Sequence, residues 1–543
     1  MLVELDSSFA SPRARCFQTC CTPACRVKWL KNKGAILIVV WSHLVGSVFH
    51  LLRTGYKETT DDYVSNTGII LVSTTLLYPI GGWLADTRIG RYTVIRYSMW
   101  IMWISSMLAT LNEVLSDMST MYGTLSSVKI WVFRALCIIM AIALGGFQSN
   151  IVQLGIDQLT DASATEITSF ITWYSLTLFT SGLSLHYISD CIASEYNMLY
   201  IKTLTVALCL TVALCSDFLF QHWLVKEQIA GKSLQTILKV IKYTIRNRKL
   251  RYSFTNEGEP LSSFDVAKHR YGGTFTDQQV ENVHTFLWMM VVMATCAIVS
   301  GVLVPVGYAQ EKVMTHLINW EEAAGFTGCY EKLSIHYCTF ISVIVVVLVY
   351  EFVIHPLFSR CLPRVSIMNM FLLGTIMTFM WIMSLLTIET IACQDQLYSG
   401  KCVFTDESSR VNMNYRWLLI PESMCGLSSF CIILSALEFM WSQAPSTMKG
   451  MILGFGYTFL GLSALLHTAI ASPFIFRKPV TVSWENIKLT CGIWYFLMEG
   501  MITLVVLIVI TVLLQRYKKR NKRNSYFDPY ATCITAASYN QDS

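Results

Sequence analysis

An acidic residue lies near one end of a long apolar segment, in the stretch LEFMWSQAPSTMKG at 437–450. An ionised carboxylate inside a membrane helix costs about 2.5–3.5 kcal/mol on insertion scales, so it usually faces a watery cavity or a charged partner. We therefore expect Glu438 either to line a cavity, where it can bind a cation or a proton, or to pair with a Lys or Arg near the helix end. The helical period places it on a half-polar face with Cys431, Leu434, Ser435 and Ser442.

A second group of charges follows two glycines in GGWLADTRIGRYTVI, residues 81–95. Glycines permit a tight turn and a close approach of helices, and opposite charges form strong hydrogen-bonded pairs. Asp86, Arg88 and Arg91 are therefore predicted to pair across the cytosolic ends of neighbouring helices and to act as a gate latch. The alternative is a static turn enriched in basic residues.

Two other titratable residues lie within apolar segments. His43 is the only such group in AILIVVWSHLVGSV, and histidine changes its charge near neutral pH. It is a candidate for proton coupling together with Glu438, and the alternative is a structural histidine with satisfied hydrogen bonds. Glu499 in FLMEGMITL is either a functional group or an interhelical contact, and the sequence leaves both interpretations open.

Patterns typical of catalysis or cofactor binding are absent from the sequence. It contains no nucleotide-binding G-x-x-x-x-G-K-[ST] motif, no suitably placed G-x-G-x-x-G or G-x-S-x-G motif, and no C-x-x-C spacing for zinc. We predict that the protein is not an enzyme and needs neither a cofactor nor a metal.

The composition indicates which elements must position these residues. Of the 543 residues, 54% are hydrophobic and 14% are charged, whereas soluble domains carry about 25% charged residues. The net charge of +6 is small and spread along the chain, which argues against a nucleic-acid partner and for a lipid bilayer. Spanning the bilayer takes about 20 apolar residues in a helix. Twelve segments reach or approach this length: 34–52, 66–85, 93–111, 130–155, 168–190, 197–219, 284–308, 337–358, 366–389, 415–440, 450–475 and 489–515.

The spans form two groups of six around a polar insert. Lys and Arg concentrate in alternate loops and in the insert, which predicts that both termini are cytosolic. Within the insert, SLQTILKVIKYTIRNRKLR has the period of an amphipathic helix, expected on the inner leaflet or on the cytosolic ends of the bundle. The predicted domains are an N-terminal tail at 1–33, a six-helix half at 34–219, a cytosolic linker at 220–283, a second six-helix half at 284–515 and a C-terminal tail at 516–543.

Several of these segments resemble known transporters. GGWLADTRIGRYTVI is similar to the loop between the second and third helices of the major facilitator superfamily. ALGGFQSNIVQLGIDQL at 143–159 and the segment containing Glu438 are similar to the fourth-helix and tenth-helix signatures of the proton-coupled oligopeptide transporters, the solute carrier 15 family. The resemblance implies an all-α membrane protein with the major facilitator fold, in which twelve transmembrane helices form two six-helix halves.

The resemblance also implies roles for individual residues. In the family, the glutamate at the position of Glu438 faces the amino group of the substrate, and a fourth-helix lysine meets its carboxylate. Here Gln148 replaces that lysine, so the contact is neutral and a free carboxylate should bind less tightly. Tyr308 and Gln310 lie where relatives line the substrate pathway. The E-x-x-E-R cluster that relatives use for proton coupling is missing from the first span.

These observations predict a secondary active transporter that moves di- or tripeptides, or peptide-like zwitterions, by alternating access. Proton symport is left open because charges used by relatives are missing. Two alternatives remain: an uncoupled uniporter for another small solute, and a transporter-like scaffold or sensor without transport. The sequence places the protein in either the plasma membrane or an endolysosomal membrane.

Overall fold

The computed structural model describes fifteen parts of the chain. These are residues 27–54, 75–118, 126–160, 162–181, 184, 200–226, 233–247, 264–302, 306, 326–354, 367–397, 415–475, 482–484, 487–489 and 491–523.

Each of the twelve predicted spans overlaps a helix in the described residues, so the all-α prediction is confirmed. The second span is described as helical over residues 75–84. The others are α3 (Lys33–Thr54), α5 (Arg91–Met118), α6 (Ser126–Asp157), α7 (Ala164–Ser181), α9 (Tyr200–Phe220), α11 (Asp277–Gly301), α13 (Phe326–Val349), α15 (Ile367–Leu397), α16 (Leu419–Gln443), α17 (Lys449–Ile475) and α18 (Cys491–Arg523).

Eight of the described helices are long and apolar enough to cross a membrane, and two shorter apolar stretches lie in α3 and α13. Several helices extend beyond the predicted spans. For example, α11 begins at Asp277 rather than 284, and α13 begins at Phe326 rather than 337. Helical hydrogen bonds continue through polar residues outside the hydrocarbon, so the apolar stretch underestimates helix length. A short hairpin of β1 (Val482–Trp484) and β2 (Ile487–Leu489) precedes α18 and was not predicted.

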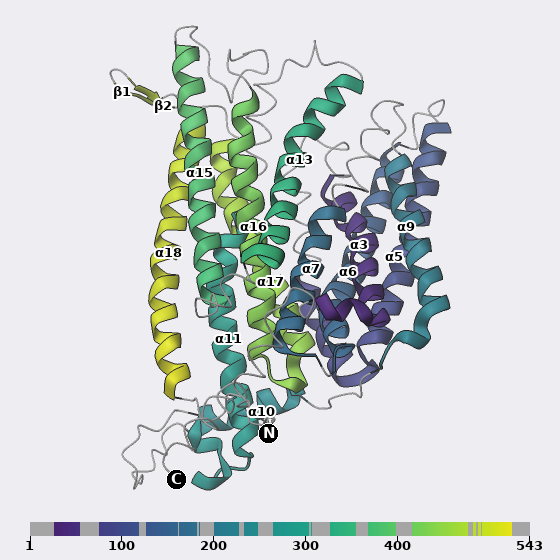
Figure 1. The fold of residues 1–543 in the computed structure, drawn as a ribbon, viewed down its shortest axis with the longest axis vertical. Helices are drawn as coiled ribbons and strands as arrows, with labels where there is room; N and C mark the ends of the chain where they lie inside the picture. Colours follow the sequence, from purple (N-terminus) through teal and green to yellow (C-terminus); the bar gives the residue numbers. More distant parts are fainter. Residues whose placement is uncertain are drawn as a thin grey trace, which may run out of the picture.

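The helices form two groups (Figure 1). One group, here called the N-terminal half, consists of α3, residues 75–84, α5, α6, α7 and α9, and the C-terminal half consists of α11, α13 and α15 to α18. Within the N-terminal half, α5 packs on α6 and α9, while α3 packs on α6, α7 and α9. Within the C-terminal half, α15 packs on α16 and α18, and α11 packs on α17. Between the halves, α6 contacts α17 and α7 contacts α13 and α16.

The amphipathic helix of the insert is α10 (Ser233–Arg246), and it lies against one end of the bundle, here called the linker end (Figure 1). It packs on α11 and buries Ile237 and Val240, while Leu238 is 60% exposed. The rest of the described insert is bound to α11. The buried amino group of Lys268 forms ion pairs with Asp265 of the insert and with Glu281 of α11. Burial alone would lower the pKa of Lys268, but these two carboxylates outweigh it and raise that pKa.

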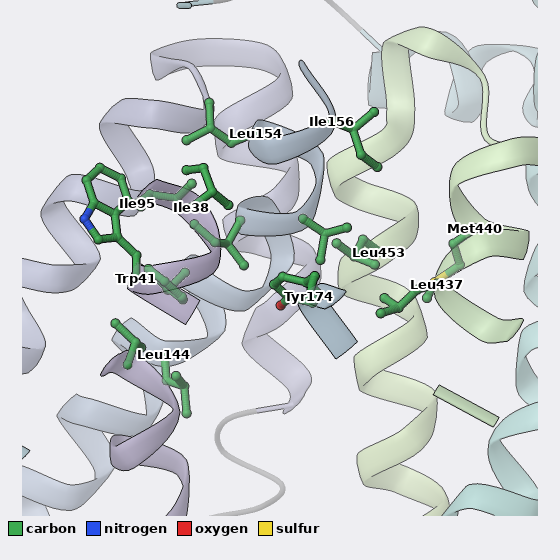
Figure 2. Close-up of a cluster of buried hydrophobic side chains, with 14 of the residues drawn as sticks. Ile38, Trp41, Ile95, Leu144, Leu154, Ile156, Tyr174, Leu437, Met440 and Leu453 are labelled. Atoms are coloured by element: carbon green, nitrogen blue, oxygen red, sulfur yellow. The ribbon is translucent and has the colours of Figure 1, made fainter. Parts of the chain in front are cut away.

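A single hydrophobic cluster extends across both halves near the linker end. Figure 2 shows Ile156 and Tyr174 of the N-terminal half close to Leu437 and Leu453 of the C-terminal half. Apolar side chains buried between the halves hold them together in this conformation. The polar groups described below are therefore set within a packed interface.

Candidate functional site

Glu438 lies on α16 and points toward the N-terminal half. The hydroxyl of Thr168 on α7 donates a hydrogen bond to Glu438 Oε1 at 3.0 Å. Both side chains are partly buried, so the carboxylate is neither in the packed core nor at the outer surface of its own half. The structure therefore places Glu438 at the interface of the halves, in contact with the opposite one.

Gln148 lies on α6, is buried, and accepts a hydrogen bond from the hydroxyl of Tyr174 on α7 at 3.1 Å. The Tyr174 hydroxyl is also close enough to Tyr457 on α17, in the other half, to interact with it electrostatically. The Tyr457 ring in turn meets the edge of Tyr78, with ring centroids 5.3 Å apart. A neutral, hydroxyl-rich cluster thus surrounds Gln148.

Glu438 and Gln148 are linked to the same helix. Their partners Thr168 and Tyr174 are six residues apart on α7, which is about 9 Å along the axis and 120° around it. The Glu438 carboxylate and the Gln148 amide therefore come from opposite halves and contact α7 at two different levels along its axis.

His43 on α3 is placed beside α7 rather than beside a carboxylate. Its Nδ1 lies 3.2 Å from the Thr180 hydroxyl and its Nε2 lies 3.1 Å from the Ser184 hydroxyl. Two hydroxyls satisfy both ring nitrogens, so the geometry agrees with the structural alternative for this residue. Tyr308 and Gln310 lie outside the described residues.

Asp86 and Arg91 of the 81–95 loop form a buried cluster with the end of α6. Arg91 Nη2 lies 3.1 Å from Asp86 Oδ1, and Arg91 Nη1 bonds Asp157 Oδ2 at 2.5 Å. The Gln153 amide completes the cluster by donating to Asp157. Arg88 is exposed and forms no ion pair with a described residue.

Asp86 also joins the two halves. Its Oδ2 accepts a hydrogen bond from the backbone N–H of Met451, in the first turn of α17, at 3.0 Å. The first four N–H groups of a helix have no partner within the helix and carry partial positive charge. Asp86 therefore caps α17 from the opposite half, and this bond requires the linker ends of the halves to be together.

Glycines bring the backbones into contact at the same place. A Cβ added at Gly82 would lie 2.2 Å from the carbonyl oxygen of Gly450, and one at Gly454 would lie 2.6 Å from that of Tyr78. These distances are too short for any side chain. The helix at 75–84 and α17 thus approach as closely as their backbones allow.

We expect Gly82→Ala to destabilise this closed arrangement by about 1–3 kcal/mol, the usual cost of overpacking. The clash is with backbone, so no side-chain rotation relieves it. Thermal unfolding of the purified protein should show a lower midpoint. Gly500→Ala is the matched control, because its added Cβ would meet nothing closer than 3.7 Å. Equal midpoints for the two variants would show that the halves do not pack here as described.

The sequence missed the neutral partners of the site. Thr168, Tyr174 and Tyr457 carry no charge and lie in helices rich in hydroxyls and aromatic rings, so nothing in their types marks them. Asp157 lies in the segment 143–159, whereas its partner Arg91 lies in the segment 81–95, far from it in the sequence. Only the packing of α6 against the 81–95 loop shows that these two residues belong together.

No family model matches the chain. Among solved structures, it is similar to the POT family transporter PepTSo, with a TM-score of 0.64 and 13% identity over 90% of this chain and 99% of that one. An auto-inhibited POT family peptide transporter gives a TM-score of 0.60 with 14% identity, covering 89% and 97% of the two chains. A POT family transporter in complex with 5-aminolevulinic acid gives 0.54 with 11% identity over 89% and 96%.

The chain has the major facilitator fold. In transporters with this fold, substrate sites lie near the bilayer midplane between the repeats, which rock around them. Glu438 and Gln148 occupy opposite sides of that interface here, and the Asp86 cap closes its linker end.

Proposed function

We propose that the protein is a secondary active transporter and a divergent member of the oligopeptide transporter family. Its substrates are small zwitterions, with di- and tripeptides or peptide-like molecules as the leading class. The fold, the apolar helices and the motifs around Gln148 and Glu438 support this assignment. Neighbouring structures include a transporter in complex with 5-aminolevulinic acid and one in complex with a thioalcohol-conjugated peptide.

The contact between Glu438 and Thr168 carries the proposal. A carboxylate on one half that already meets the other half can bind a substrate ammonium group where both halves touch it. Binding there would sense the relative position of the halves, which alternating access requires. A structural carboxylate would instead be held within its own half, as Glu422 is by Thr339 of α13.

Gln148 supplies the second contact, to the substrate carboxylate. Its amide donates a neutral hydrogen bond, which is roughly half as strong as a charged one. Amidation of the C-terminus of a dipeptide should therefore weaken wild-type uptake only slightly. This role for Gln148 rests on the resemblance of segment 143–159 to the fourth-helix signature of the oligopeptide transporters.

Gln148→Lys is expected to raise the preference for a free carboxylate by about 10-fold, because a charged hydrogen bond adds about 1–1.5 kcal/mol. The measurement is competition of labelled dipeptide uptake by a free dipeptide and by its amide. Gln148→Met serves as the uncharged control. A lysine at the nearby Gln153 would not be a suitable control, because the Gln153 amide donates a hydrogen bond to Asp157. An unchanged preference in Gln148→Lys would place the substrate carboxylate elsewhere.

We further propose that both termini and the linker end are cytosolic. In this orientation, the Asp86 bond to α17 closes the cytosolic side, and transport requires that bond to break. Asp86 and Arg91 then act in the gate, while Arg88 only adds positive charge to the cytosolic loop. Whether the membrane is the plasma membrane or an endolysosomal one follows from cellular imaging.

The test is uptake of a labelled dipeptide by liposomes containing the purified protein, with and without an imposed pH gradient. Uptake that accelerates with an inward proton gradient and acidifies the lumen supports symport, whereas gradient-independent uptake identifies a uniporter. Absence of uptake for a broad panel of zwitterions, together with a partner bound to the 220–283 insert, would favour the scaffold or sensor alternative.

A further inference from the structure

A buried acid–base pair lies in the C-terminal half, away from Glu438. His467 on α17 is 1% exposed and Glu499 on α18 is fully buried. His467 Nδ1 lies 2.8 Å from Glu499 Oε2, and His467 Nε2 lies 2.9 Å from the carbonyl oxygen of Ile298 on α11. The pair therefore connects three helices of one half.

The hydrogen-bond partners determine where the protons are. A carbonyl oxygen can only accept, so Nε2 carries a proton and donates it to Ile298. The remaining contact is between the second ring nitrogen and a carboxylate oxygen, and both are acceptors unless one of them holds a proton. At 2.8 Å, one proton must lie between Nδ1 and Oε2. Without it, two lone pairs would face each other in a medium of low dielectric constant.

Among the described residues, the helices around Glu499 bring no Lys or Arg close to it. No Lys or Arg occurs in α11, α15 or α16 or in the apolar part of α18, and Lys449 lies 18 residues from His467 on α17, about 27 Å along the axis. The nearby titratable groups are neutral or acidic. Tyr495 interacts with Glu499, and Cys296 lies on the neighbouring helix α11. On α15, Ile382 lies opposite Gly500, and Glu389 is about 10 Å further along the helix axis. Glu422 is hydrogen-bonded to Thr339 of α13.

One oxygen of the pair is still available. Glu499 Oε1 is buried and has no hydrogen-bond partner among the described residues. Ser463 Oγ, one turn before His467 on the same face of α17, is also buried without a hydrogen-bond partner there. An unpaired buried acceptor is unfavourable, and more so when it carries a charge. A proton shared between Oε2 and Nδ1 leaves the pair without net charge.

We propose that His467 and Glu499 form a proton-binding site whose shared proton fastens α17 to α18 and α11. Loss of that proton leaves a carboxylate against an unprotonated ring nitrogen and separates the two helices. The site is 16 residues, about 24 Å, along α17 from Met451, where Asp86 holds the same helix from the other half. Loss of the proton thus weakens the attachment of one end of α17 to the other helices of its own half. The hydrogen bond from Met451 to Asp86 attaches the other end of α17 to the opposite half.

Peptide-resolved exchange of the histidine C2 hydrogen for deuterium tests the site directly. The rate of this exchange rises as the ring loses its second proton, and mass spectrometry follows each histidine separately. The full-length protein in lipid nanodiscs is titrated from pH ~5 to pH ~9, a range that brackets the ordinary pKa of histidine, about 6.5. His222, on the turn after α9, is the internal reference. No substrate is added, so the result does not depend on the proposed transport function.

Glu499→Gln supplies an amide donor in the same shape and removes the shared proton, so the His467 midpoint should fall by at least about one pH unit, a 10-fold change in proton affinity. Glu422→Gln, a carboxylate of the same half that bonds α13, should leave it unchanged. Identical His467 midpoints in the wild type and Glu499→Gln would overturn the proposal. If that variant does not fold, Glu499→Asp, whose shorter side chain withdraws the carboxylate from Nδ1, is measured instead, and a His467 midpoint identical to that of the wild type overturns the proposal equally.

Discussion

Replacing Glu438 with glutamine is expected to lower the efficiency of dipeptide uptake by about 10- to 100-fold. A hydrogen bond to a charged group contributes about 1.5–3 kcal/mol, and each 1.4 kcal/mol is a factor of ten. Glutamine keeps the shape and can still accept from Thr168, so the fold and the contact between the halves should survive. The initial rate of uptake into liposomes, measured as a function of dipeptide concentration, gives the effect.

Glu422→Gln is the matched control for that experiment. Glu422 is on the same helix, sixteen residues earlier, and its carboxylate accepts from Thr339 of α13 within the C-terminal half. The two carboxylates point about 160° apart around α16. Uptake by Glu422→Gln should stay close to the wild type. Equal losses in both variants would mean that Glu438 supports structure rather than substrate.

Removing the Asp86 carboxylate is expected to open the linker end of the halves. Asp86→Ala breaks a buried pair with Arg91 and leaves the Met451 N–H without its acceptor. Breaking a buried ion pair typically costs about 3–5 kcal/mol, and Arg91 retains Asp157, so the lower value applies here. Hydrogen exchange of the first turn of α17 should accelerate by about 100-fold, as measured by mass spectrometry.

Arg88→Ala is the control that distinguishes the loss of the Asp86 contacts from a general change in charge. Arg88 is two residues from Asp86, exposed, and without an ion pair among the described residues, so its loss should leave exchange in α17 within about 3-fold of the wild type. The opposite pattern would contradict the assignment of the cap: accelerated exchange of the first turn of α17 in Arg88→Ala and no acceleration in Asp86→Ala.

The twelve helices could be predicted because a bilayer requires long apolar helices, a signal carried by each segment alone. The position of Glu438 followed from the high cost of a carboxylate in lipid, and the structure does place it against the opposite half. The structure gives Asp86 and Arg91 a contact, but joins them to Asp157 and α17 rather than to Arg88.

Other features could not be inferred from residue types. The placement of Tyr174 beside Gln148 and Tyr457 depends on how α6, α7 and α17 pack, and neutral hydroxyls leave no pattern in a sequence. The partner of Glu499 was equally hidden. His467 lies 32 residues earlier on another helix, and only the packing of α17 against α18 brings the two together.

The most direct test of the account is whether Glu438 recognises a substrate amino group. Binding of a dipeptide and of its N-acetylated form is measured by calorimetry, for both the wild type and Glu438→Gln. The account predicts that the wild type binds the free amine about 10-fold or more tightly and that this preference disappears in the variant. A preference that persists undiminished in Glu438→Gln would contradict the central claim.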